Sequence, residues 1–180
     1  KAKYVIIAIG TPIDEYLNPK TQAFLKACNK LIPYLDQSQI IIIRSTVYPN
    51  TAQIFFDEIN LKKEGEWHVA YCPERIMQGY SIKELKELPQ IVSGMSQKAT
   101  EEASKLFGLL SPKIIQVPIK EAELVKLFTN AWRYIQFAVT NQFYMISQSF
   151  GADYDKVRHA MTEGYGRTGT LPSAGFAAGP

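Results

Sequence analysis

Few features of this sequence suit a disulfide-stabilised, metal-binding or membrane-spanning protein. Its 180 residues contain two cysteines, Cys28 and Cys72, and two histidines, too few for a disulfide framework or a metal cluster. The purely aliphatic runs at 5–9 and 40–43 are far shorter than the roughly 20 residues of a membrane span. The apolar run after Lys3 is also too short for the core of a signal peptide. We therefore expect a cytoplasmic protein with reduced cysteines and no bound metal.

The charged residues of the chain are also not clustered in any one segment. The net charge of +3 is spread along the sequence without a basic run, which argues against a nucleic-acid-binding surface. The length suits one compact domain with part of a second. The chain begins without Met, almost directly in a strand pattern, and stops within the Gly- and Pro-rich "LPSAGFAAGP". We expect an internal piece of a longer protein.

What the sequence does contain is an alternation of strand and helix patterns. Buried-type strands are predicted at 4–10, 39–46, 68–73, 89–94 and 113–118, with helices at 21–35, 51–60 and 96–110 between them. Such alternation indicates βαβ crossovers and a parallel sheet. We predict an α/β fold with an incomplete, Rossmann-like doubly wound sheet over residues 1–118. A long central helix then opens a helical region over 119–180.

Polar residues follow the predicted strands. Ligands of such sheets bind beyond the carboxyl ends of the strands, which directs attention to 10–12, 44–51, 72–79 and 93–96. These segments supply the hydroxyls of Thr11, Ser45 and Thr46 and the carboxylate of Glu74. A threonine after a strand is more often a cap or a turn residue, and a loop glutamate is usually solvated. Together, at one edge, they predict a polar cleft.

The long helix carries a polar stripe on an otherwise apolar surface. Lys126, Asn130, Arg133 and Asn141 share one face at 3.6 residues per turn. A solvated face of an amphipathic helix is the commoner explanation of such a stripe. The rest of the circumference is apolar, and we expect it to be buried nearly all round; it comprises Leu124, Leu127, Phe128, Ala131, Trp132, Ile135 and Ala138. A lysine in that setting either extends to solvent or belongs to a site.

A known family shares these motifs in the same order. "GTP", "STVYPNT", "PERIMQG", "QIVSG", "AELVKLFTNAWR" and "PSAGFAAGP" together resemble the UDP-glucose/GDP-mannose dehydrogenase family, whose members are NAD-dependent nucleotide-sugar 6-dehydrogenases. "PER" in place of "PEF" is more similar to members that act on UDP-N-acetylhexosamines, such as UDP-N-acetylmannosamine.

The resemblance implies a four-electron oxidation of a sugar C6 alcohol to a carboxylate, for polysaccharide biosynthesis. Two NAD molecules act in turn, and a catalytic cysteine holds the substrate. By the same resemblance, Lys126 and Asn130 stabilise the oxyanion and contact the substrate, and Glu74 activates water. Thr46 serves both the water and the nicotinamide. The resemblance further implies that the cofactor is contacted by Thr11, Ser45, Thr46 and Gln78. It implies that the substrate is also contacted by Arg167 and Gly175. The family's central helical region implies a homodimer.

The sequence also departs from the family pattern. The glycine-rich dinucleotide fingerprint at the first strand is missing, and so is the catalytic cysteine expected after the final loop. Gln78 stands where many relatives carry Glu, and the final loop has fewer glycines than usual. We therefore expect the 180 residues alone to be inactive.

Two other interpretations remain open. The 3-hydroxyisobutyrate and 6-phosphogluconate dehydrogenases also place "KxxxN" on a long helix after a Rossmann domain, with the lysine as acid or base. The "STVYPNT" and "PER" segments favour the nucleotide-sugar family. The second is a non-catalytic module that dimerises through the aromatic helix face.

Overall fold

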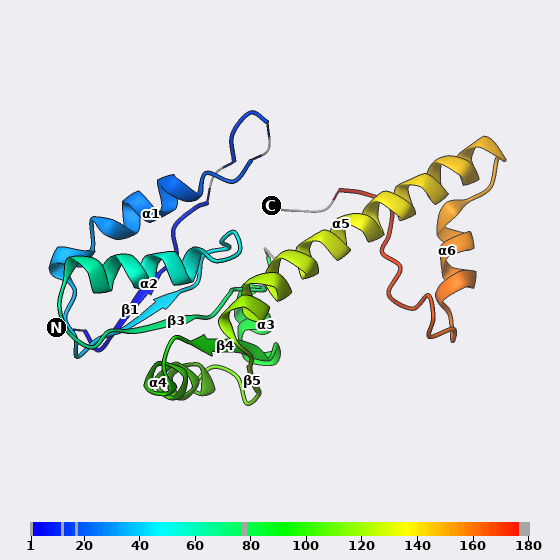
Figure 1. Ribbon diagram of the computed structural model, residues 1–180. Helices are drawn as coiled ribbons and strands as arrows, with labels where there is room; N and C mark the ends of the chain where they lie inside the picture. Colours follow the sequence, from blue (N-terminus) through cyan, green and yellow to red (C-terminus); the bar gives the residue numbers. More distant parts are fainter. Residues whose placement is uncertain (1, 12, 17, 77–78, 177–180) are drawn as a thin grey trace. The chain divides into compact units, whose positions relative to one another are not determined.

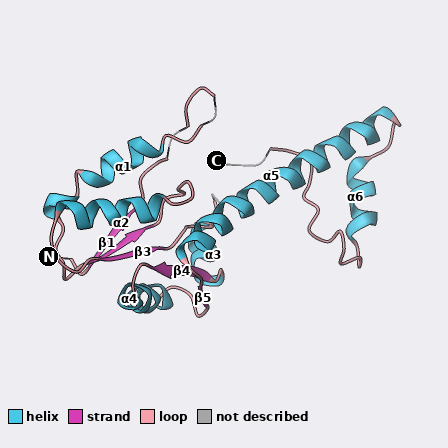
Figure 2. Cartoon of the chain, viewed as in Figure 1, coloured by secondary structure: helices cyan, strands magenta, loops and turns pink. Residues whose placement is uncertain are grey.

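The computed structural model describes residues 2–11, 13–16, 18–76 and 79–176 (Figure 1). The strands are β1 (Tyr4–Ile7), β2 (Ile40–Ile43), β3 (His68–Tyr71), β4 (Gln90–Gly94) and β5 (Ile114–Gln116). The helices are α1 (Thr21–Asn29), α2 (Thr51–Lys62), α3 (Ser81–Glu87), α4 (Gln97–Gly108), α5 (Ile119–Ser149) and α6 (Tyr154–Thr162), with a 3₁₀ turn, η1 (Ile32–Tyr34). Figure 2 shows the helices separated by short strands and loops. The sequence predicted the five strands and helices α1, α2, α4 and α5 but not α3, and η1 lies within the helix predicted at 21–35.

The sheet runs in the order β1-β2-β3-β4-β5. Its inner strand β2 consists of β-branched isoleucines that are all buried, as expected of a strand covered on both faces. Helices α1 and α2 cover one face, where Phe24, Phe55 and Ile59 pack on Ile41 and Val69. Helix α4 covers the other face (Figure 1). This arrangement confirms the predicted α/β, Rossmann-like doubly wound sheet.

Two strands run against the prediction. Strand β4 pairs antiparallel with β3, with Tyr71 opposite Ser93, and β5 is parallel to β4, so both run opposite to the parallel strands β1, β2 and β3. A parallel connection needs a crossover helix that packs on the sheet, but α3 has only seven residues and its described side chains are exposed or half-buried. The chain therefore re-enters the sheet at the carboxyl edge of β3 and runs back.

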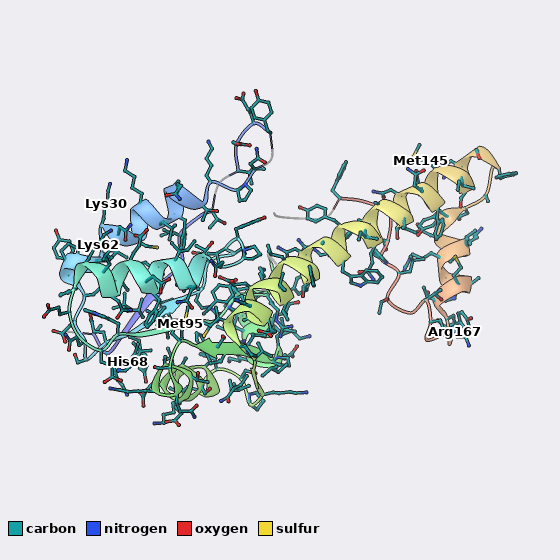
Figure 3. All side chains as sticks on the ribbon, viewed as in Figure 1. Lys30, Lys62, His68, Met95, Met145 and Arg167 are labelled. Carbon is teal, nitrogen blue, oxygen red and sulfur yellow. The ribbon has the colours of Figure 1, made fainter. Side chains whose placement is uncertain are left out.

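The direction of β4 corrects one predicted site segment. Residues 93–96 include the last two residues of β4 and lie near the amino end of β3, where the N–H of Met95 donates to the carbonyl of Val69 at 2.8 Å. The His68 ring lies 3.3 Å from the hydroxyl of Ser96, the N-cap of α4 (Figure 3). The prediction that 93–96 joins the other strand-end loops was wrong. The start of β4, at Gln90, takes that place.

The chain divides into two compact units, residues 1–127 and 128–180, each described here by itself. In the second unit, α5 ends before Gly151, whose φ of +65° favours glycine. The side chain of Asp153 then caps α6 by accepting from the N–H of Asp155 at 3.0 Å. No helix that the structure describes is both long and apolar enough to cross a membrane.

The apolar side of α5 was expected to be buried, and in this chain it is exposed. Phe128, Trp132 and Ile135 are 65%, 60% and 53% exposed. The polar stripe is the better covered side, because Lys126, Asn130, Arg133 and Asn141 are all half-buried. Helix α5 therefore turns its hydrophobic residues outward.

A buried carboxylate joins the start of α5 to the start of α2. Glu123 is 0% exposed and accepts from the N–H of Asn50 at 2.6 Å and of Ala52 at 3.0 Å. Asn50, at the N-cap position of this helix, makes no side-chain cap and has φ of +74°. Glu123 supplies the acceptor from another helix.

This contact predicts a large loss of stability on truncation. Glu123→Ala leaves the N–H groups of Asn50 and the buried Ala52 without their acceptor, and we expect the free energy of unfolding to fall by about 2 to 4 kcal/mol. Urea unfolding followed by circular dichroism measures it, with the exposed neighbour in Glu121→Ala as control. A loss no larger than that of the control would contradict the capping role.

Burial also makes this contact sensitive to pH. It raises the pKa of Glu123 above the ordinary 4.5, against the lowering effect of the N–H groups of Ala52, Asn50 and Thr51. A raised folded-state pKa makes the folded chain lose stability as pH rises above about 4.5. The wild-type unfolding free energy minus that of Glu123→Gln should therefore decrease on titration upward from pH 4. A difference that grows over this range would be inconsistent with the raised pKa.

Candidate active site

Three parallel strands end side by side at the carboxyl edge of the sheet. The hydroxyl of Ser45, just after β2, donates to the carbonyl of Ile9, beyond β1, at 2.7 Å. The N–H of Glu74, beyond β3, donates to the carbonyl of Arg44 at 3.4 Å. The structure thus brings together three of the four predicted strand-end segments.

Glu74 is held in a fixed orientation at this edge. Its Oε1 accepts from the N–H groups of Arg75 at 2.8 Å and Ile76 at 3.1 Å. Its other oxygen, Oε2, forms an ion pair with the guanidinium of Arg44. Because both oxygens have donors, the carboxylate is fixed in direction and its charged form is stabilised. A loop carboxylate that is merely solvated would lack these contacts.

Arg44 is the residue of this edge that sequence reasoning missed. It is buried, its guanidinium carbon lies 4.6 Å from the centre of the Phe107 ring, and Nη1 donates to Oε1 of Gln90 at 3.3 Å. Burial lowers the pKa of this guanidinium from its usual value. An arginine directly after four buried isoleucines was a usable signal, since a cation at a buried strand end needs a partner.

The predicted hydroxyl-bearing residues differ in accessibility. Thr11 is exposed and Thr46 is half-buried. Ser45 is buried and its hydroxyl links the ends of β1 and β2. Gln78 lies outside the described residues.

Lys126 and Asn130 lie one turn apart on α5, and both are half-buried. Lys126 follows the buried Glu123 by three residues, so the contact of Glu123 with α2 also fixes the helical turn that carries Lys126. A cation and an amide at this spacing can converge on one oxygen.

The two remaining predicted site residues lie in the second unit. Arg167 is exposed, and Nη1 donates to the hydroxyl of Tyr165 at 3.4 Å (Figure 3). Gly175 is held by the Asn141 side chain, which donates to its carbonyl at 2.8 Å and accepts from its N–H at 2.9 Å. Asn141 belongs to the polar stripe of α5, so this stripe binds the chain's own backbone.

Neither cysteine suits a nucleophile. Cys28 and Cys72 are free and fully buried, as the sequence predicted. Burial raises the pKa of each thiol to about 12, which leaves almost no thiolate at neutral pH.

The carboxyl edge of the sheet has open space for a ligand next to Gly10. A Cβ built on Gly10 would meet nothing within 4 Å, so a ligand can approach the backbone beyond β1, beside the exposed Thr11. A G-x-G-x-x-G spacing occurs at 164–169, but there it follows α6 and lies in turns. The phosphate-binding fingerprint needs a strand before it and a helix after it, so this motif is not the cofactor site.

Two family models match the chain in succession. The NAD binding domain of the UDP-glucose/GDP-mannose dehydrogenase family matches residues 1–110, and the central domain of the same family matches 120–179. The matches include the strand-end segments in the first model and helix α5 in the second.

Individual relatives agree with these models. The chain is 34% identical over 166 residues to UDP-N-acetyl-D-mannosamine dehydrogenase of Methanococcus vannielii, covering 89% of this chain and 38% of that protein. A solved UDP-D-ManNAc dehydrogenase of Pyrococcus horikoshii is 26% identical with a TM-score of 0.84, covering 99% of this chain and 43% of the other. A GDP-mannose dehydrogenase of Pseudomonas aeruginosa shares the fold, with a TM-score of 0.79 at 19% identity over 89% of this chain and 39% of the other.

The chain thus spans about two fifths of the length of such relatives. Its motifs, its sheet and both successive matches agree, and the chain belongs to the UDP-glucose/GDP-mannose dehydrogenase family, with that family's NAD-binding domain.

Proposed function

We propose that the chain is part of a longer, cytoplasmic enzyme, here called the complete enzyme, that oxidises the C6 alcohol of a UDP-sugar to a carboxylate. Each turnover passes two hydrides to two NAD molecules, and water supplies the second carboxylate oxygen. A UDP-N-acetylhexosamine is the proposed substrate, and polysaccharide biosynthesis the proposed use of the product. Residues 1–118 belong to the NAD-binding domain and 119–180 to the central helical domain.

The observation that carries this proposal is the succession of two models of one family along the chain. The choice of sugar is supported by the 34% identity to a UDP-N-acetyl-D-mannosamine dehydrogenase. The proposed nucleophile is a cysteine outside these residues, because the thiols of Cys28 and Cys72 are buried and protonated.

Lys126 and Asn130 are proposed to stabilise the negative oxygen that develops on C6. Their half-buried positions one turn apart on α5 limit the competition from water. Preorganised donors of this kind act mainly on the transition state. Arg167 and Gly175 are proposed to contact parts of the substrate other than this oxygen.

Glu74 is proposed to orient and deprotonate the water that releases the carboxylate product. Its contacts with Arg44 and two backbone N–H groups keep it ionised and therefore able to accept a proton. The same contacts fix the direction of the carboxylate. NAD accepts the hydrides when bound, and Thr11, Ser45, Thr46 and Gln78 are the residues proposed to hold it.

A substrate panel tests the function directly. The complete enzyme is mixed with NAD and, in separate reactions, with a series of UDP- and GDP-sugars and with small hydroxy acids, and NADH absorbance is followed. We expect two NADH for each UDP-N-acetylhexosamine consumed. One NADH per small hydroxy acid would favour the 3-hydroxyisobutyrate or 6-phosphogluconate type. No reduction with any substrate would favour a non-catalytic module.

Replacement of Lys126 tests the oxyanion role. We expect Lys126→Ala to lower kcat of the complete enzyme about a hundredfold or more, because a preorganised cation is lost. Steady-state kinetics measure the change, and Lys120→Ala, a charge at the start of α5, is the control. A kcat within about twofold of wild type would refute the catalytic role of Lys126 and indicate that the polar stripe is a solvated face.

Replacement of Glu74 tests the hydrolytic step. Glu74→Gln keeps an acceptor for the backbone donors but cannot take a proton, so the enzyme should stall after covalent capture of the substrate. Intact-protein mass spectrometry should then show an adduct of nucleotide-sugar mass, while Glu87→Gln, at an exposed site, turns over normally. Circular dichroism checks the fold, since Gln removes the charge that Arg44 contacts. Normal product release by Glu74→Gln would refute this role.

The exposed side of α5 supports a homodimer. Its apolar residues recur every three or four positions along one face, namely Phe128, Trp132, Ile135, Val139, Phe143 and Ile146. Such a stripe exceeds the scattered apolar exposure of ordinary surfaces. We propose that two copies bury this face against each other about a twofold axis.

A charge on this face should disrupt the dimer. Trp132→Glu places a carboxylate in the proposed apolar contact, and we expect monomers or insoluble protein at micromolar concentration. Light scattering of the complete enzyme measures the mass, with the exposed Gln148→Glu as a control that adds the same charge near the end of the helix. A soluble wild-type monomer would eliminate the dimer.

A further inference from the structure

In the second unit, the segment after α6 returns beside α5, and Asn141 holds its backbone (Figure 1). Nδ2 of Asn141 donates to the carbonyl of Gly175 at 2.8 Å, and the N–H of Gly175 donates to Oδ1 at 2.9 Å. One side-chain amide therefore satisfies both backbone groups of one residue. Both partners are half-buried, so the pair is partly protected from competing water.

This pairing depends on the identity of both residues. An aspartate has no donor for the carbonyl, and a glutamine is longer by one methylene. Gly175 has φ of +155°, where side chains are rarely found, although a Cβ there would meet nothing within 4 Å. The glycine is thus required by backbone conformation. Nearby, Gln136 donates to the hydroxyl of Thr170 at 3.4 Å, a second and weaker contact between α5 and this segment.

We infer that Asn141 is a positioning residue that fixes segment 170–176 before substrate binds. The inference rests on the proposed function, in which Gly175 contacts the nucleotide sugar. A loop that is already ordered loses less conformational entropy on binding. Asn141 therefore improves substrate affinity through Gly175 without touching the substrate. It has a role separate from that proposed for Lys126 and Asn130 on the same stripe.

Amide hydrogen exchange of the 180-residue chain tests the structural half. Asn141→Ala removes two hydrogen bonds, and we expect exchange at the Gly175 N–H to accelerate about thirtyfold. Asn141→Asp keeps the acceptor but turns a carboxylate toward a carbonyl, so it should also accelerate exchange. Gln142→Ala, the exposed neighbour, should match wild type. Exchange in Asn141→Ala within twofold of wild type overturns the inference, provided circular dichroism shows an intact fold.

Kinetics of the complete enzyme test the functional half. We expect Asn141→Ala to raise KM for the nucleotide sugar about tenfold, with kcat reduced less than threefold and KM for NAD unchanged. Faster exchange with an unchanged sugar KM would overturn the positioning role while leaving the dehydrogenase activity established. A wild-type enzyme that oxidises no nucleotide sugar would instead refute the proposed function, and with it this role.

Discussion

A carboxylate without solvent contact holds the start of the long helix to the start of α2. Glu123 is fully buried and accepts two N–H groups at the first turn of α2. Helix α2 directly follows the segment that carries Ser45 and Thr46. The same contact therefore fixes the position of these strand-end hydroxyls relative to the turn of α5 that carries Lys126. Tyr71 lies in the same buried region, where burial and the Glu123 carboxylate raise the pKa of its hydroxyl. Residues far apart in the sequence are thereby fixed within one compact unit.

Helix α5 uses its two sides in an unusual way. Its polar stripe is half-buried, and Asn141 in this stripe binds the backbone at Gly175. Its apolar residues point outward, and Phe128 and Trp132 are more than half exposed. A surface helix of a monomer normally has the opposite arrangement. The helix therefore serves two surfaces, with hydrogen bonding on one and hydrophobic association proposed on the other.

Local sequence patterns predicted the fold well, and contacts between distant residues limited the rest. The isoleucines of β2 specify a buried strand without reference to any other segment. The cap of α4 is equally local, because the Ser96 hydroxyl accepts from the N–H of Ala99, three residues later. The direction of β4 depends on whether α3 packs on the sheet, which a single sequence does not encode locally. The contact of Arg44 with Glu74 and the capping of α2 by Glu123 join segments 30 and more than 70 residues apart. Such pairs have no periodic signal, so only the burial of a charge hinted at them.

The capping of α2 by Glu123 also changes the electrostatics of the carboxyl edge. The first turn of a helix carries a partial positive charge and commonly attracts phosphate. In α2 the side chain of Glu123 already accepts from two of these N–H groups. An anionic ligand would therefore find them occupied. The phosphates of a dinucleotide bound at this edge would consequently need donors other than these two N–H groups.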